Sequence, residues 1–343
     1  MLVAQLIGRR EFRVLEQALP EPGPGEVQVR VDAVGICGSD LHSYGEGGIG
    51  DMACVYPMVL GHEPAGTVLK TGPGVTGWSA GDRAALEPAI YCYHCEFCRS
   101  GQHNLCTNIR FMSNPGEPGF FREMVNLPAG NLMPVPGRMP FEIACMMEPL
   151  AVALHSMKFA AIQPGETVAV VGAGPIGLLT LACLKVARAG RIWAIEPVAG
   201  RRALAKCMGA DVAIDPAEAD PVAEIAADTA GRGVDCAIDC AAKEGTTNQA
   251  IRSLRNGGRL VLTGIHSEVM VPVEVSSMRR KELAIFNVRR SNHQSEAALD
   301  LLKEHTDRFA PLVTHKRPLR DIASAFHMLE RYEDGVGKLV IQS

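Results

Sequence analysis

The sequence has no excess of positive charge. Its 34 Lys and Arg residues are outnumbered by 38 Asp and Glu residues, so the chain of 343 residues carries a formal net charge of -4. Proteins that bind nucleic acid or anionic membranes usually present a basic surface, so neither is expected as a partner. Internal repeats and low-complexity segments are absent as well. With 47% hydrophobic and 21% charged residues, the chain has the composition of a folded protein, and its length predicts two domains.

Export and membrane signals are also lacking. Residues 1–7 have no basic start and no long apolar core, so no secretory signal is expected there. One uncharged run, residues 167–184, reaches the minimum length of a membrane span. Three glycines and a proline interrupt it, which favours a buried strand, a turn and a helix start over a continuous span. We therefore expect a cytoplasmic protein.

Eleven cysteines are present, an odd number. In a chain without an export signal, a cluster of thiols favours metal binding over disulfides. Four of them follow the spacing C-x2-C-x2-C-x7-C, and four thiolates close a tetrahedral zinc shell with no open position. Four free thiols would instead be open to oxidation. The sequence therefore predicts a structural zinc site formed by Cys92, Cys95, Cys98 and Cys106, with His94 and His103 as competing ligands.

A second group of zinc-type ligands lies upstream. Cys37, His62 and Glu63 offer one thiol, one imidazole and one carboxylate, and three protein ligands leave a fourth position for water or substrate. A His beside a Glu is by itself often only a polar pair. The glycines at 61, 66 and 72 around a short strand-like run indicate a sharply bent backbone near a site. The group is a candidate catalytic zinc site.

The pattern of predicted secondary structure changes near residue 165. Before it, short β-like runs at 27–34, 66–69 and 83–86 are separated by Pro and Gly, which predicts a mostly antiparallel β domain. After it, strands and helices alternate, which predicts a doubly wound parallel sheet. Strands are expected at 168–171, 192–195, 212–214, 234–238, 260–263 and 284–288, and helices at 175–189, 201–208 and after Pro216; the tail supplies helices at 295–304 and 319–330 and a strand at 338–341.

A glycine motif links the first of these strands to its helix. In Gly172-Ala-Gly174-Pro175-Ile176-Gly177, the first glycine makes the turn, the second lets a pyrophosphate approach the backbone, and the third lets helix and strand pack closely. The helix N-terminus favours the phosphate charge. A plain strand-to-helix turn is the alternative. Glu196, at the end of the next strand, is the acidic residue that a dinucleotide ribose requires.

Two stretches resemble a known family. Gly61-His62-Glu63-x2-Gly66-x5-Gly72-x2-Val75 and Cys37-Gly-Ser39-Asp40-x-His42 are similar to segments of the zinc-containing medium-chain dehydrogenases, the alcohol dehydrogenase family. The likeness covers nearly the whole chain, and residues 49–51 and 57–63 look most like the polyol (sorbitol and xylitol) branch. The resemblance implies a GroES-like, mostly β catalytic domain of residues 1–152 and 290–343 that carries both zinc sites. A Rossmann domain of residues 153–289 and a homo-oligomer, tetramer or dimer, are also implied.

The resemblance also implies roles in the active site. Cys37, His62 and Glu63 would hold the catalytic zinc, and Glu148 would ligate it directly or through water. Asp40 would orient His62. Ser39 and His42 would relay the substrate proton to solvent, although an ordinary turn serine and a surface histidine are alternatives for these two.

The substrate and cofactor contacts follow by the same resemblance. Tyr44 and Arg289 align with polyol-contacting positions, while Arg290 replaces an aromatic residue common in that branch. Phe120 and Phe121 either wall the substrate pocket or pack in the core. Arg201 would serve the ribose side of the cofactor.

Together these features predict an enzyme that uses two zinc ions per chain and NAD to oxidise a secondary hydroxyl of a small-molecule polyol or vicinal diol to a ketone. Glu196 predicts NAD over NADP, because its charge would oppose the 2′-phosphate. A threonine-type amino-alcohol dehydrogenase and a catalytically silent nucleotide-binding protein of the same fold are the alternatives.

Overall fold

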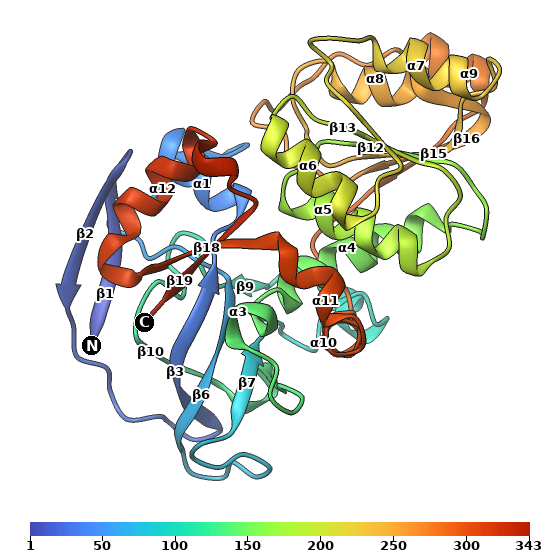
Figure 1. Cartoon of the computed structure of the whole chain (residues 1–343). Coiled ribbons are helices and arrows are strands. Elements are labelled where there is room, and N and C mark those ends of the chain that lie inside the picture. The colour runs from blue at the N-terminus through green and yellow to red at the C-terminus, as the bar shows by residue number, and fades with distance from the viewer.

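The chain folds into two lobes, each built on a β-sheet (Figure 1). This computed structural model describes residues 1–343. The lobe that contains the N-terminus is mostly β, and the second lobe carries helices on both sides of its sheet. Both predicted domain types are therefore present.

A seven-stranded sheet forms the first lobe, in the order β11-β7-β6-β3-β19-β18, with β10 also paired to β3. All its pairs are antiparallel except β18 with β19, as predicted for a mostly antiparallel domain. Its strands are β3 (Glu26–Gly35), β6 (Glu63–Thr71), β7 (Arg83–Leu86), β10 (Met124–Pro128), β11 (Leu132–Pro134), β18 (Val313–Pro318) and β19 (Lys338–Gln342).

Smaller elements surround this sheet. A hairpin of β1 (Leu2–Gly8) and β2 (Glu11–Glu16), which the sequence patterns did not reveal, packs at its edge. The remaining elements of this lobe are α1 (Gly38–Gly45), β4 (Gly48–Ile49), β5 (Met52–Ala53), β8 (Ala89–Ile90), α2 (Glu96–Arg99), β9 (Arg110–Phe111), α3 (Phe141–Ala144), α10 (Ser295–Glu304), α11 (Thr306–Phe309) and α12 (Ile322–Glu330).

The second sheet has six parallel strands in the order β14-β13-β12-β15-β16-β17. This is the doubly wound order, whose direction reverses between β12 and β15, and ligands bind at the carboxyl ends of the strands at that point. The strands are β12 (Val168–Val171), β13 (Ile192–Ile195), β14 (Val212–Ile214), β15 (Val234–Asp239), β16 (Leu254–Leu262) and β17 (Ala284–Asn287). The helices are α5 (Pro175–Val186), α6 (Ala199–Met208), α7 (Pro221–Asp228), α8 (Thr246–Ser253) and α9 (Val275–Lys281).

The bounds predicted from the sequence for β12, β13 and β14 agree with the structure at every residue, because each strand is a short, fully apolar run between turn residues. The helix expected to reach residue 189 ends at Val186 instead. The cause is Arg188, whose left-handed φ of 58° stops the helix. The expected helix 319–330 consists of a 3-10 turn at 319–321 followed by α12.

One long helix was not anticipated. α4 (Met147–Ala160) has buried side chains all around its axis, so it lacks the one-sided apolar periodicity that reveals a surface helix. It packs against α5 of the second lobe and against α10. A single cluster of 37 buried residues joins strands of both sheets through these helices. The lobes therefore share a core.

The predicted domain boundaries stay a proposal. Pairing of β19 with β3 supports the return of the tail to the first lobe. The proposed boundary at residue 152, however, lies inside α4.

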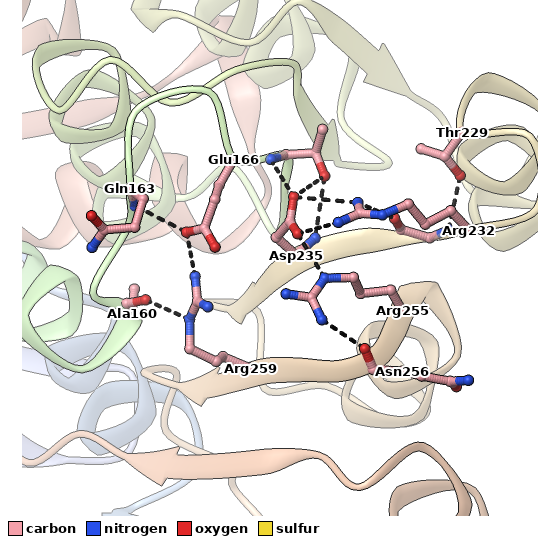
Figure 2. A network of polar contacts seen from close by, with 11 residues as sticks. Ala160, Gln163, Glu166, Thr229, Arg232, Asp235, Arg255, Asn256 and Arg259 are labelled. Carbon is pink, nitrogen blue, oxygen red and sulfur yellow. Dashed lines mark hydrogen bonds and ion pairs between the residues drawn. The ribbon is translucent and has the colours of Figure 1, made fainter.

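A polar network holds the start of the second sheet together (Figure 2). The buried carboxylate of Asp235 accepts hydrogen bonds from Arg232 (2.6 Å), Arg255 (2.7 Å) and both the backbone and the hydroxyl of Thr167 (2.9 Å each). Burial opposes the charge, but the two guanidinium groups hold the pKa of Asp235 well below its usual range. This network lies at the amino end of β15, away from the ligand-binding end of the sheet.

Candidate active site

Cys37, His62 and Glu63 converge between the first two strands of the β sheet. β3 and β6 are antiparallel, and their register pairs Gly35 with Glu63. Cys37 therefore emerges from β3 beside the start of β6. The thiol, one imidazole nitrogen and one carboxylate oxygen all lie within 4.8 Å of one another. The strand register thus assembles the predicted donor set.

Negative charge surrounds the imidazole of His62. Asp40 Oδ1 lies 3.4 Å from Nδ1, and Ser39 Oγ lies 3.4 Å from Nε2. Asp40 is fixed in turn by the backbone N–H groups of Cys37 (3.0 Å) and Gly61 (3.1 Å). Burial disfavours a charged His62, but Asp40 and Cys37 outweigh it and raise its pKa. The site therefore attracts a cation. Nδ1 faces Asp40, which leaves Nε2 on the side of Ser39, as expected when Asp40 orients the ring.

Lys338 is a residue of this site that sequence reasoning missed. Its ammonium group contacts the Glu63 carboxylate and donates to the Ile36 carbonyl at 2.9 Å, and both charged side chains are 1% exposed. Burial opposes the charge of Lys338, but Glu63 and Cys37 raise its pKa. A lysine inside the apolar strand Lys338–Gln342 was the available signal, since such a residue needs a buried partner.

Glu148 lies close to this cluster without joining it. It occupies the first turn of α4 and is 9% exposed, and burial raises its pKa to about 8. Its charge acts on His62 and Glu63, but its carboxylate is outside the group of converging ligand atoms. The geometry gives no support to direct ligation in this conformation. Ligation through water stays a prediction.

The four cysteines of the second predicted site also converge. Cys92, Cys95, Cys98 and Cys106 have sulfurs within 4.8 Å of one another. The Cys92 sulfur lies 3.9 Å from that of Cys98 and 3.5 Å from that of Cys106. Four sulfurs bonded to one zinc ion lie about 3.8 Å apart. The backbone N–H groups of His94 and Cys95 lower the pKa of Cys92 to about 5, which favours a thiolate. Both donor sets therefore fit zinc.

A cleft of about 490 Å³ opens at the switch point of the parallel sheet. Gly172 and Gly174 line it from the turn that joins β12 to α5. Gly172 has a φ of 89°, and a Cβ there would lie 2.8 Å from Ala241, while a Cβ on Gly177 would lie 1.9 Å from the Gly172 carbonyl. Only open space faces Gly174. The turn therefore leaves room for a pyrophosphate to approach the backbone, with Pro175 and Ile176 in the first turn of α5.

Glu196 lies at the floor of this cleft. Its carboxylate accepts hydrogen bonds from the backbone N–H groups of Ala173 (2.8 Å) and Val198 (3.0 Å). Arg201 also lines the cleft, with its guanidinium 4.4 Å from the centre of the Tyr332 ring. Arg202 forms an ion pair with Asp215 at 2.8 Å. Four of the predicted dinucleotide-binding residues, Gly172, Gly174, Glu196 and Arg201, thus line one cavity.

The remaining predicted residues are less closely grouped. Ser39 and His42 lie three positions apart on α1, and His42 Nδ1 contacts Glu46 at 3.0 Å. Tyr44 packs in the core, its ring stacked 5.6 Å from that of Phe12. Arg289 is exposed. A substrate role for these two rests on the resemblance alone.

Phe120 and Phe121 are fully buried. Of the two alternatives left open for them, their placement favours core packing.

Comparison with known proteins agrees with this geometry. Residues 23–137 match the model of the alcohol dehydrogenase GroES-like domain, and residues 175–304 match that of the zinc-binding dehydrogenases. The chain belongs to the zinc-binding alcohol dehydrogenase family. The family resemblance and the fold class predicted from the sequence are thereby confirmed, as is an oxidoreductase of the alcohol dehydrogenase type.

Individual members of this family align over almost the whole chain. A sorbitol dehydrogenase of Bacillus subtilis is 32% identical, covering 99% of this chain and 97% of that protein. The structure of 2R,3R-butanediol dehydrogenase from Bacillus subtilis has a TM-score of 0.89 at 31% identity, covering 100% of this chain and 99% of that one. A zinc-binding dehydrogenase from Sinorhizobium meliloti bound to NADP has a TM-score of 0.91 at 29% identity, with 100% and 99% coverage. None of the helices combines the length and the apolar character that a membrane-spanning helix requires.

Proposed function

We propose that the protein is a zinc-dependent, NAD-linked dehydrogenase that oxidises a secondary hydroxyl of a polyol or vicinal diol to a ketone. The observation that carries this proposal is the convergence of Cys37, His62 and Glu63 on one point. The similarity to enzymes named for sorbitol and butanediol supports this substrate class.

The residues around that point would divide the work. When bound, zinc supplies a Lewis acid for the alcohol oxygen, and the nicotinamide supplies a hydride acceptor. Cys37, His62 and Glu63 would hold the metal. Asp40 would keep the His62 ring in its orientation. The Ser39 hydroxyl, which already contacts His62, would take the proton of the alcohol. His42, one helical turn further along α1, would pass that proton toward solvent.

We further propose two zinc ions per chain with different tasks. The mixed donor set has a carboxylate paired with Lys338 and is the one suited to exchange a ligand. The four-cysteine set offers only thiols and would close a structural shell.

A spectrophotometric screen of polyols and diols with NAD tests the function, and metal analysis tests the zinc content. Oxidation of threonine in preference to every polyol would favour the amino-alcohol alternative. One zinc per chain with no turnover of any alcohol would favour the silent nucleotide-binding protein.

A homo-oligomer remains part of the proposal, because one edge of the parallel sheet is uncovered. β17 pairs only with β16. Ile285 of β17 is 38% exposed, and the loop before α9 exposes Val269 (76%) and Met270 (88%). An unpaired edge strand that exposes an apolar side chain favours pairing with a second copy, and the apolar residues of the exposed loop favour association as well. Light scattering after size exclusion measures the oligomeric state. The parent protein is expected to be an oligomer, and the Ile285→Lys variant is expected to be a monomer.

A further inference from the structure

Arg290 is a cation near the candidate zinc site that the proposed mechanism does not use. Its guanidinium carbon lies 4.0 Å from the centre of the Phe111 ring. The ring of Phe111 is in turn 5.5 Å from that of His62. Arg290 therefore contacts the aromatic ring that also borders the zinc-ligand candidate. Its neighbour Arg289 is exposed.

The backbone at Arg290 is unusual. Its φ of 54° lies in the left-handed region, which residues other than glycine seldom adopt. Such conformations persist where the surrounding structure fixes them, and they concentrate at functional sites. The segment is fixed here because Asn104 donates to the Arg289 carbonyl at 3.1 Å and Asn292 donates to the Gly101 carbonyl at 2.9 Å. Both partners belong to the lobe that carries the four cysteines.

Apart from the Phe111 ring, the guanidinium group has no partner within the protein. It donates no hydrogen bond and joins no ion pair, and its Nη1 atom is buried without an acceptor. Glu87 and Glu148 are near enough to influence its pKa but do not contact it. The Glu87 carboxylate instead accepts a hydrogen bond from Ser295 Oγ at 2.8 Å. Arg290 is half-buried, and its Nη1 atom is buried without an acceptor. Arginine stays charged in proteins, and burying a donor of a charged group without an acceptor is costly, so this group marks a place for an anion.

We propose that Arg290 receives an anionic group of the substrate, so that the alcohol oxidised here is a polyol bearing a carboxylate or a phosphate. The inference rests on the proposed function, because it takes the reacting hydroxyl to lie beside Cys37 and His62. A guanidinium group offers two parallel N–H donors to either kind of oxyanion. Arg290 thereby selects the charged substrate and fixes which hydroxyl reaches the metal ligands. It acts as a binding residue and takes no part in proton or hydride transfer.

The test uses three ligands of one configuration: a hexitol, its hexonate and its 1-phosphate, repeated over several configurations. The values of kcat/KM with NAD are expected to favour the hexonate or the phosphate by tenfold or more. Charged hydrogen bonds contribute enough for Arg290→Gln to lower the anionic value by about 10- to 100-fold. The kcat/KM of Arg290→Gln for the hexitol is expected to stay within about threefold of that of the parent enzyme. Arg290→Lys, which keeps the charge but loses the planar pair of donors, is expected to fall between. Arg279→Gln, at an exposed arginine of α9, is the control for net charge.

Binding provides a readout that does not depend on turnover. Calorimetric titration of the full-length protein saturated with NADH is expected to show the anionic ligand binding at least tenfold more tightly than the hexitol, with that difference lost in Arg290→Gln. The ligand that gains most distinguishes carboxylate from phosphate. Equal or better use of the hexitol by the parent enzyme, or an equal loss on all three ligands in Arg290→Gln, overturns the inference and leaves the proposed function intact. If no alcohol is oxidised and none of the three ligands binds, both fail.

Discussion

Replacing Glu196 with Gln changes the charge at the floor of the cofactor cleft while keeping the shape of the side chain. The carboxylate already accepts hydrogen bonds from the backbone N–H groups of Ala173 and Val198. Each of its oxygens can accept a second hydrogen bond, so both remain available to ribose hydroxyls. Gln preserves one acceptor oxygen. Glu196→Ala would remove both ties to the glycine turn and mix a structural change with the electrostatic one.

The expected size of the effect comes from the charge. Two unit charges about 4 Å apart at an effective dielectric near 20 repel by about 4 kcal/mol. Screening by salt that halves this value leaves about 2 kcal/mol, or roughly thirtyfold in favour of NAD over NADP. Two arginines nearby are the natural partners of a 2′-phosphate. Arg202 is engaged by Asp215, and Arg201 lies against Tyr332, so we expect the Gln variant to narrow the preference without reversing it.

Steady-state kcat/KM with each cofactor, measured on one alcohol that the enzyme oxidises, decides the matter. The parent enzyme is expected to prefer NAD by tenfold or more, and Glu196→Gln to reduce that ratio by about tenfold. Glu304→Gln removes an exposed carboxylate outside the cleft and is expected to leave the ratio unchanged. Parity, a preference for NADP in the parent, or an unchanged ratio in Glu196→Gln would refute the reasoning.

Three further predictions concern the zinc sites, the relay and the sheet. Cys98→Ser is expected to lower zinc content and thermal stability, because structural zinc binding contributes to folding. Cys37→Ser is expected to abolish turnover while keeping a near-normal melting temperature. A Cys98→Ser protein that is as stable as the parent yet inactive would contradict these roles. His42→Ala is expected to slow turnover by about 100-fold or less and to steepen its rise with pH, and a loss equal to that of a His62→Ala variant with the same zinc content would exclude the relay. Asp235→Asn is expected to lower the free energy of unfolding in urea by about 2 kcal/mol at pH 7. Since the folded-state pKa of Asp235 is lowered, its contribution is complete above about pH 4 and declines in stronger acid; a gap between parent and variant that does not shrink below pH 4 argues against the ion pairs.

Local patterns were sufficient for much of the fold. β12, β13 and β14 are short apolar runs bounded by turns, and the glycine turn follows β12 directly. The four cysteines lie close together in the chain, so their spacing alone indicated a metal site. Cys37 is distant in sequence from His62 and Glu63, and that group was predicted only with the help of the nearby glycines and the family resemblance. α4 was missed because a helix buried on every side has no polar face to mark its period.

Long-range contacts account for what could not be predicted in the site. Lys338 meets Glu63 across 275 positions of the chain, through pairing of β19 with β3. Arg290 contacts Phe111 because the segment around Arg290 packs on the lobe that carries the four cysteines. The sequence marked Arg290 only as a departure from a related pattern, and the absence of a hydrogen-bond acceptor for its buried Nη1 becomes visible only in three dimensions.

α4 connects the metal-type cluster to the cofactor lobe, and this connection bears on when Glu148 could move. Glu148 lies in its first turn, beside the metal-type cluster, while the rest of the helix packs on α5 and reaches β16 of the cofactor lobe. A helix of 14 residues is about 21 Å long, so a tilt of about five degrees about its far end displaces its first turn by about 2 Å. That is enough to carry a carboxylate between direct contact with a metal and contact through one water. If the cofactor lobe closes on its dinucleotide and tilts α4 with it, the distance of Glu148 from the metal ligands changes when the cofactor binds.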